Sequence, residues 1–163
     1  IRMPAMGLGN AAGVLAGQNL GAKQPERAEK TAWLSVGLFT GVMFVISVVV
    51  WFWPEYVVSV FNTEPGLVAT AATFLRIQIV HFMVSGITLV LMSCLNGVGD
   101  TWAPTLNTLI TLWGVQMPLA YLLSRFTTIG VFGVRWAMVI AVVIRAAVYV
   151  VYFKTGRWKS KKV

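Results

Sequence analysis

The chain has 163 residues, of which 58% are hydrophobic and only 11% charged, with a mean hydropathy of +0.78. About 25% of the residues of a soluble globular domain are charged, so this composition excludes an ordinary soluble domain and indicates a polytopic membrane protein. The formal net charge of +8 does not indicate a nucleic-acid-binding protein, because the basic residues lie at the ends of apolar segments and form no single footprint.

Hydropathy predicts an all-α membrane bundle over residues 1–153, followed by a basic tail over residues 154–163. A helix needs about 20 apolar residues to cross the hydrocarbon core of a bilayer. Four of the apolar stretches reach this length, and the first, over about residues 3–20, is short. The predicted helices cover about residues 1–20, 31–53, 67–95, 103–124 and 130–153.

The distribution of basic residues predicts the orientation of the chain. Lys23, Arg27 and Lys30 lie in the first connection and several more basic residues lie in the tail, whereas residues 54–66 include no Lys or Arg. The positive-inside rule therefore places the first connection and the C-terminus in the cytoplasm and residues 54–66 outside. A multi-pass protein of the inner or plasma membrane is expected.

The N-terminus does not have the pattern of a signal peptide. The chain starts at Ile1, with no basic n-region, isolated apolar core or small-residue cleavage site. We interpret these features as those of a chain that begins inside a longer protein.

The sequence shows no signature of a cofactor, metal or catalytic site. Cys94 is the single cysteine and lies in an apolar segment, so it supports neither a disulfide nor a metal cluster and is expected to be buried packing. His81, Cys94 and Asp100 do not share a helix face, and no nucleophile and base have a useful spacing. An intramembrane enzyme is therefore disfavoured.

Glycines recur every four residues in the first segment, at Gly9, Gly13, Gly17 and Gly21. This spacing places them on one helix face, where two helix backbones can approach closely. Packing against a partner helix is the simpler interpretation of the stripe, and a functional role stays open. Gly21 is also expected to cap the helix, and Pro25 to start a short following helix.

Polar residues recur along one face of the third segment. Unpaired polar groups in lipid cost several kcal/mol, so this face must meet protein or water. One interpretation is hydrogen bonding between helices, with a neutral His81, and the other is the wall of a solvated cavity. The residues are Gln78, His81, Ser85, Thr88 and Asn96, at spacings of 3, 4, 3 and 8.

A similar stripe is predicted in the fourth segment, which supports the cavity interpretation. Pro118 lies deep in this segment and is expected to kink it and free a carbonyl group. The residues of this stripe are Asn107, Thr111, Gly114, Pro118 and Tyr121.

Turn residues predict where the third helix starts and ends. Thr63 is expected as its N-cap, and Gly97 and Gly99 are expected to end it. Asp100 or Thr101 is then expected to cap the next helix, which makes a catalytic or ion-binding role for Asp100 the less favoured reading.

Arg145 lies in the last apolar segment, nine residues before Lys154. This distance is ~13 Å along a helix, too far for the side chain to reach the interface easily. A lipid-facing guanidinium near mid-span costs about 2.5–3.5 kcal/mol, so Arg145 should face protein or water. Arg135 lies in the same segment, and the same argument applies more weakly to Arg76. None of the five acids lies inside a predicted span, so no acidic partner is evident.

An ordered set of motifs resembles the C-terminal lobe of transporters of the multidrug and toxic compound extrusion (MATE) family. The resemblance extends over nearly the whole chain, and the order of the motifs makes it specific. The motifs are GQNLGA at residues 17–22, PERAEK after it, FLRI at 74–77, LNGVGDTWAPTLN at 95–107 and the later MPLAYLL.

The resemblance implies part of a twelve-helix protein with two six-helix lobes, from within the eighth helix to the end of the twelfth. GQNLGA then corresponds to a cytoplasmic turn after an even-numbered helix. The positions that match the family's structural motifs are Gly17, Gln18, Gly21, Gly97, Asp100, Thr101 and Pro118.

The N-terminal lobe, the seventh helix and the start of the eighth lie outside this sequence, so a complete central cavity needs a companion lobe. Some members of the family use acids in the C-terminal lobe to bind the coupling cation. Since no span here contains an acid, the resemblance implies that H⁺ or Na⁺ binds in the missing lobe.

The function implied is export of organic, often cationic, drugs by alternating access, coupled to H⁺ or Na⁺. Met83, Met92 and Trp113 are expected to add apolar contacts to the cavity. The residues expected to line the cavity are Gln78, His81, Ser85, Asn107, Thr111 and Tyr121.

Two alternatives remain open from the sequence. A flippase of lipid-linked oligosaccharides would carry anionic substrates and would be favoured by a cavity ringed by Arg76, Arg135 and Arg145. A truncated lobe that acts only as an assembly partner would show no transport by itself.

Overall fold

The computed structural model describes residues 2–61, 64–126 and 131–160, and every regular element in these ranges is a helix. Short connections link successive helices. The elements are α1 (Arg2–Gly21), α2 (Pro25–Phe52), α3 (Pro54–Ser59), α4 (Pro65–Gly97), α5 (Trp102–Leu109), the π-helical segment η1 (Ile110–Gln116), α6 (Met117–Phe126), α7 (Val131–Lys154) and the 3₁₀ helix η2 (Arg157–Ser160).

Four helical stretches in the described ranges are long and apolar enough to cross a membrane. They are α2, α4, the continuous stretch Trp102–Phe126 and Phe132–Lys154 of α7. The expectation of an all-α membrane bundle is confirmed.

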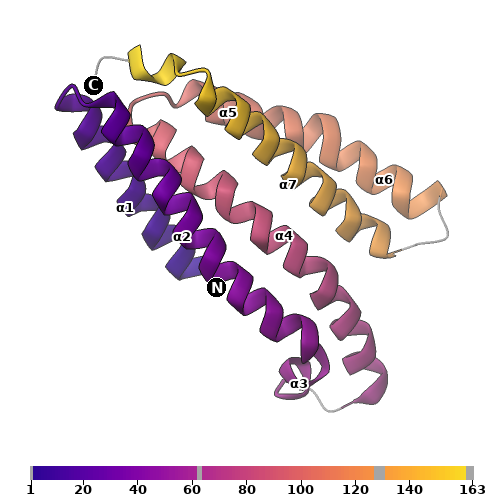
Figure 1. The fold of residues 1–163 in the computed structure, drawn as a ribbon. Helices are drawn as coiled ribbons and strands as arrows, with labels where there is room; N and C mark the ends of the chain where they lie inside the picture. Colours follow the sequence, from indigo (N-terminus) through magenta and orange to yellow (C-terminus); the bar gives the residue numbers. More distant parts are fainter. Residues whose placement is uncertain (1, 62–63, 127–130, 161–163) are drawn as a thin grey trace.

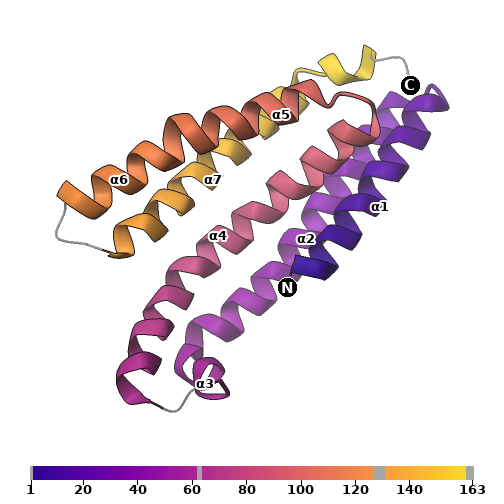
Figure 2. The ribbon, with the colours of Figure 1, turned by 180° about the vertical axis from the view of Figure 1, so that it is seen from behind.

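The helix α4 lies at the centre of the bundle (Figures 1 and 2). It packs against α1 and α2 on one side and against α7 on another, and α3 folds back onto it. The α5–η1–α6 stretch packs mainly against α7. α4 therefore contacts both the N-terminal and the C-terminal helices of the chain.

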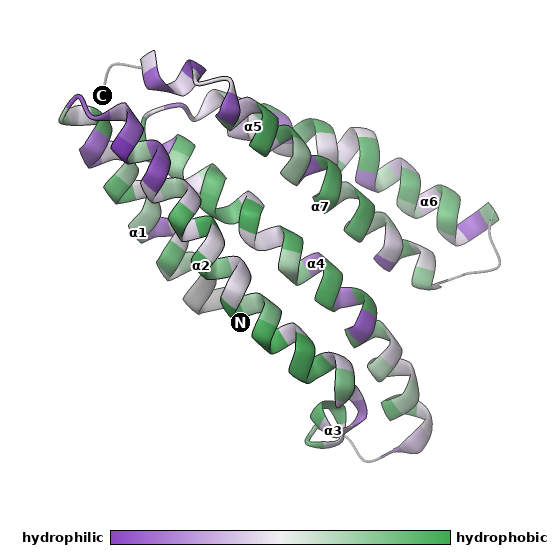
Figure 3. Ribbon diagram, viewed as in Figure 1, coloured by the Kyte–Doolittle hydropathy of each residue, from purple (hydrophilic) through white to green (hydrophobic). Residues whose placement is uncertain are grey.

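The α1–α2 connection, the α4–α5 connection and η2 lie at one end of the bundle, and α3 lies at the other (Figure 1). Hydrophilic residues gather at the first of these ends, whereas most of each long helix is hydrophobic (Figure 3). We call this first end the basic end, because it contains Lys23 and the residues of η2. The two basic segments identified in the sequence therefore lie on the same side.

The core lies toward the basic end, between α1, α2, α4 and α7. Small side chains such as Ala16 and Ala32 let α1 and α2 approach α4, where Leu91 and Leu95 are fully buried. Cys94 belongs to this core and is 1% exposed, which confirms its expected role as packing.

The first three glycines of the stripe pack against α4. A Cβ atom on Gly13 would lie 2.5 Å from the carbonyl oxygen of Ser93, and one on Gly17 would collide with the carbonyl of Gly97. Gly97 in turn leaves no room for a Cβ atom beside Gly13. A Cβ on Gly21 would meet nothing within 4 Å, so the contact ends at Gly17.

The prediction that Gly21 caps α1 is wrong. Gly21 is the last residue of α1, and the residue with positive φ is Lys23, at 60°. The amide of Gln24 donates to the carbonyl of Asn19 and the amide of Lys23 to that of Leu20, which together form a Schellman motif. The left-handed residue thus lies two positions later than expected, at Lys23, which adopts this conformation without being a glycine.

The end of α4 follows the sequence prediction more closely. Gly99 has φ of 79°, and its amide donates to the carbonyl of Asn96. The amide of Asp100 donates to the carbonyl of Leu95, which completes a second Schellman motif. The left-handed residue is therefore Gly99, while Gly97 provides close packing.

The expected N-caps have other contacts. Thr101 occupies the N-cap position of α5, but its side chain makes no capping hydrogen bond. Asp100 is 2% exposed and accepts a hydrogen bond from Tyr152 of α7. The expected cap Thr63 lies outside the described residues.

One prediction about prolines is wrong, and the structure shows the local helix geometry at a second proline. Pro25 does not start a separate short helix, because α2 continues from Pro25 to Phe52 without interruption. Pro118 follows the π-helical segment η1, where the amide of Met117 donates to the carbonyl of Leu112. The missing amide of Pro118 is thus accommodated by a wider helical turn. The α5–η1–α6 stretch is helical without interruption (Figure 2).

Candidate functional site

The structure separates the six expected cavity residues into two groups and one isolated residue. Gln78, His81 and Ser85 are partly exposed on α4. Asn107 and Thr111 are 8% and 3% exposed. The sixth residue, Tyr121 of α6, is 57% exposed and joins neither group.

The first group links α4 to α7 through a chain of three side chains. Nη1 of Arg135 donates to Oε1 of Gln78 over 3.2 Å, and Nε2 of Gln78 lies 3.3 Å from Nδ1 of His81. The guanidinium of Arg135 also lies over the ring of Phe74, 5.2 Å from its centroid. Arg135 therefore faces protein, with polar and aromatic partners on α4.

Ser85 and Thr88 bond to the backbone of their own helix. Oγ of Ser85 donates to the carbonyl of Phe82 over 2.9 Å, and Oγ1 of Thr88 donates to the carbonyl of Ser85 over 2.7 Å. Such bonds satisfy a hydroxyl in an apolar environment without any neighbouring helix. The α4 stripe thus combines one interhelical contact with locally satisfied hydroxyl groups.

The second group holds Arg145 between α5, η1 and α7. Nε of Arg145 donates to Oγ1 of Thr111 over 2.8 Å, and Oγ1 of Thr111 donates to the carbonyl of Asn107 over 2.7 Å. Nδ2 of Asn107 donates to the carbonyl of Arg145 over 3.3 Å. The three residues form a closed ring of hydrogen bonds, which agrees with the expectation that Arg145 faces protein or water.

The expected stripe on the fourth segment stops after Thr111. Gly114, Pro118 and Tyr121 are all exposed, whereas Asn107 and Thr111 are buried. The prediction assumed an uninterrupted α-helical period, but η1 has wider π-helical turns and rotates the following residues to another face. The guanidinium of Arg125 lies over the exposed ring of Tyr121, 5.9 Å from its centroid.

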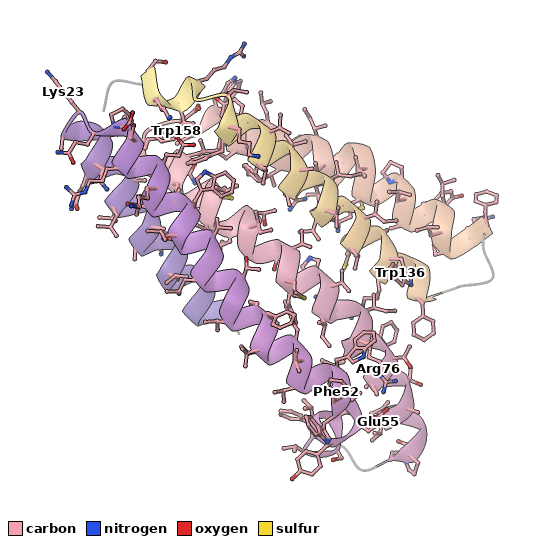
Figure 4. All side chains as sticks on the ribbon, in the orientation of Figure 1. Lys23, Phe52, Glu55, Arg76, Trp136 and Trp158 are labelled. Atoms are coloured by element: carbon pink, nitrogen blue, oxygen red, sulfur yellow. The ribbon has the colours of Figure 1, made fainter. Side chains whose placement is uncertain are left out.

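Arg76 has an acidic partner that the sequence did not reveal. Its Nη2 lies 3.1 Å from Oε1 of Glu55 in α3 (Figure 4). The sequence places Glu55 in a connection, and only the packing of α3 against α4 brings the two charges together. Both side chains remain about half exposed, so the contribution of the pair to stability is small.

Two pockets lie beside α4. The larger, of about 610 Å³, lies between α3 and α4 and includes Glu55 and Arg76 in its lining. The smaller, of about 20 Å³, lies between α2 and α4 and is almost entirely apolar. None of the six expected cavity residues lines either pocket.

The basic end contains contacts that sequence reasoning missed. Tyr152 donates to Oδ2 of Asp100 over 2.6 Å. Trp158 is fully buried, stacks on Phe153 with a centroid distance of 4.7 Å, and donates through Nε1 to the carbonyl of Phe153. The sequence predicted the tail only as a basic segment. The aromatic Trp158 within it was the feature that could have indicated packing against the bundle.

The tail also reaches the start of α2. Nζ of Lys159 lies 2.5 Å from Oε2 of Glu29, and both side chains are 32% exposed. In Figure 4, Trp158 lies toward the same end as Lys23, away from Glu55 and Arg76. The residues that the structure describes include no group of three or more His, Cys, Asp or Glu side chains able to hold a metal ion.

Membrane-length helices with polar and cationic groups held between them define a polytopic α-helical membrane protein. The MatE family model matches residues 1–122 of the chain. The chain therefore belongs to the MatE family.

Two relatives that align with almost the whole of this chain support this assignment. The chain is 24% identical to the "Probable multidrug resistance protein YoeA" of Bacillus subtilis over 163 residues, which is 100% of this chain and 35% of the relative. It is 22% identical to the "Probable multidrug resistance protein NorM" of Thermotoga maritima over 99% of this chain and 35% of the relative. The chain thus spans about a third of the length of these proteins.

Solved structures show the same fold. A "multidrug resistance MATE family transporter of the MOP superfamily" in an inward-facing conformation matches with a TM-score of 0.81 and 19% identity, over 91% of this chain and 33% of the other. A crystal structure of "MATE in the bent conformation" matches with a TM-score of 0.82 and 19% identity over the same shares. The arrangement of α1–α7 is therefore that of about one third of such a transporter.

Proposed function

We propose that the chain forms the C-terminal part of a multidrug antiporter that exports organic, often cationic, compounds by alternating access. The match of residues 1–122 to the MatE family model carries this proposal. It is supported by the names of the relatives, which are probable multidrug resistance proteins. The companion lobe, membrane lipid and the drug would be its partners.

We assign the proposed cavity wall to the part of α4 that contains Gln78, His81 and Ser85. These residues are partly exposed, and the chain of contacts with Arg135 holds Gln78 and His81 in place. Tyr121 is exposed on α6 and would contribute an aromatic surface from a second helix.

Asn107 and Thr111 would support the cavity from behind. Both are buried and their hydrogen bonds hold Arg145 inside the lobe. Their proposed role is to position the α5–η1–α6 stretch, and the substrate would contact its exposed side.

The coupling cation, H⁺ or Na⁺, is proposed to bind in the companion lobe. The five acids of the sequence lie in connections or at the ends of helices. Glu55 and Glu29 pair with basic residues, and Asp100 accepts from Tyr152. Glu29, Glu55 and Asp100 thus have structural partners within the lobe.

The three arginines within the helical segments, Arg76, Arg135 and Arg145, do not favour an anionic substrate. Arg76 pairs with Glu55, Arg135 contacts Gln78 and Phe74, and Arg145 bonds to Thr111. Each cation therefore has a partner within the lobe, which removes the observation that would support an oligosaccharide flippase.

The proposed orientation places the basic end in the cytoplasm of a cell with the protein in its inner or plasma membrane. The support is the shared location of Lys23 and η2 at one end of the bundle. Accessibility of a cysteine introduced at Ser160, measured with an impermeant maleimide in intact cells and in inverted vesicles, tests it. Labelling in intact cells would contradict the cytoplasmic assignment.

The first test of function is the intact mass of the native polypeptide, followed by transport. Because the chain covers 35% of its relatives, a full transporter would have a mass about three times 17.8 kDa. That polypeptide, reconstituted in vesicles, should move tetraphenylphosphonium against its gradient when an H⁺ or Na⁺ gradient is imposed. Failure with both ions and with several organic cations would overturn the proposal. A native mass near 17.8 kDa without a second-lobe subunit would favour an assembly role instead.

A further inference from the structure

We propose that Arg135 and Gln78 are positioning residues that hold His81 in the tautomer with its ring proton on Nε2. The chain of contacts runs from α7 to α4, and each step in it constrains the next. The consequence is that His81 acts as a hydrogen-bond donor through Nε2 in the proposed cavity wall.

The first step is the orientation of the Gln78 amide. A guanidinium is always charged and has only donors, so the atom of Gln78 that faces Arg135 must be the oxygen. The contact between Nη1 of Arg135 and Oε1 of Gln78 is 3.2 Å long. The opposite orientation of the amide would place its NH₂ group against the guanidinium.

The second step is the protonation of His81. With Oε1 directed at Arg135, Nε2 of Gln78 faces Nδ1 of His81 at 3.3 Å. The amide NH₂ group has only donors, so Nδ1 must accept with its lone pair. A neutral imidazole has one proton, which is therefore on Nε2.

The anchor of this chain is itself fixed. Arg135 lies 5.2 Å from the centroid of the Phe74 ring, and that ring stacks on Phe132 with a centroid distance of 4.7 Å. A guanidinium stacked on an aromatic face has fewer orientations available than one in solvent. The direction of the donor at Gln78 is therefore set by residues from both helices.

The tautomer makes Nε2 the donor of the His81 ring, and any contact of this donor with a substrate rests on the proposed function. The tautomer itself does not depend on transport. His81 is the single histidine of the sequence, so its signals in a larger protein can be assigned by subtraction with a His81→Gln variant.

The test is ¹⁵N NMR of the full-length protein in lipid nanodiscs, labelled at histidine. We expect one set of His81 signals in the wild type, with the chemical shifts of the Nε2–H tautomer. Arg135→Met frees the amide to rotate, so a second set of signals, from the Nδ1–H tautomer, should appear. Gln78→Glu offers only acceptors, so Nδ1 should become protonated.

Arg145→Met is the matched control, because it also removes an arginine from α7. The side chain of Arg145 bonds to Thr111 and not to Gln78. It should leave the His81 signals unchanged. An Nδ1–H tautomer or a mixture in the wild type would overturn the proposal, as would a Gln78→Glu protein with Nδ1 unprotonated. If the wild type has the expected tautomer but exports no organic cation, the proposed function fails and the tautomer assignment stands.

Discussion

The hydroxyl of Tyr152 donates a 2.6 Å hydrogen bond to Oδ2 of Asp100, which joins the end of α7 to the connection between α4 and α5. Asp100 is 2% exposed, so its carboxylate has little access to water. The contact therefore fastens two distant parts of the sequence at the basic end of the bundle.

Removal of this donor should destabilise the protein. Tyr152→Phe leaves the carboxylate of Asp100 without one of its hydrogen bonds, and bonds to charged groups contribute about 1.5–3 kcal/mol. We expect a loss of this size in the free energy of unfolding, measured by denaturant titration of the full-length protein in detergent. Tyr121→Phe is the control, because that side chain is 57% exposed, and it should change stability very little. Equal effects of the two variants would contradict the role of the Asp100 contact.

The close approach of α1 and α4 should not tolerate a methyl group. Gly13→Ala would place Cβ 2.5 Å from the carbonyl oxygen of Ser93, and backbone atoms cannot move aside as a flexible side chain can. Overpacking of this kind costs about 1–3 kcal/mol. Thermal unfolding in detergent should show the loss.

Gly41→Ala provides the matched comparison for Gly13→Ala. Gly41 lies in α2, and a Cβ atom there would meet nothing within 4 Å. Alanine is favoured over glycine in a helix by about 1 kcal/mol, so this variant should be unchanged or more stable. If Gly13→Ala also left stability unchanged, the α1–α4 packing described here would be wrong.

The buried Trp158 should hold the tail against the bundle. Trp158→Ala removes a fully buried ring and its bond to the carbonyl of Phe153, and such truncations cost about 3–5 kcal/mol in a protein core. Because the loss falls on a terminal segment, the tail should detach before the bundle unfolds. Tryptic cleavage after Lys154 or Arg157 should become faster, as followed by mass spectrometry.

Trp113→Ala tests whether loss of any tryptophan has this effect. Trp113 is 63% exposed on η1 and does not belong to the core at the basic end. Its truncation should leave the cleavage rate of the tail unchanged. Equal rates in the wild type and in Trp158→Ala would show that the ring does not secure the tail.

The bond between Arg145 and Thr111 should show energetic coupling. Thr111→Val keeps the volume of the side chain but removes the acceptor for Nε of Arg145. A double-mutant cycle with Arg145→Met should give a coupling energy of about 0.5–3 kcal/mol in unfolding experiments. Thr105→Val, at an exposed residue whose hydroxyl bonds to the carbonyl of Thr101 in its own helix turn, should show no coupling to Arg145→Met. Additive effects of Thr111→Val and Arg145→Met would contradict the hydrogen-bond ring.

Some local features were predictable because they depend on short stretches of sequence. Gly99 was expected near the end of α4 and has the positive φ that favours glycine. Gly13 and Gly17 were expected on a packing face and lie against α4. The four-residue spacing did not distinguish Gly21 from Gly13 and Gly17. Only the structure shows that the contact between α1 and α4 ends where Gly17 meets Gly97.

The candidate site was predictable only in part. The period of α4 correctly placed Gln78 and His81 together, but nothing in the sequence indicated Arg135 as the partner, 57 residues further along. On the fourth segment, η1 broke the α-helical period between Thr111 and Tyr121. A stripe inferred from a regular period holds only as far as the hydrogen-bond pattern of the helix stays regular.

The sequence by itself determined the all-α class, the four membrane-length segments and the concentration of charge at their ends, since hydropathy and charge act on each segment independently. Tertiary structure decided which polar groups meet. Glu55 reaches Arg76 because α3 folds onto α4, and Trp158 is buried because the tail returns to the core. A side chain in lipid requires some partner, but its residue type does not specify which one. Only the packing of helices distant in sequence supplies that partner.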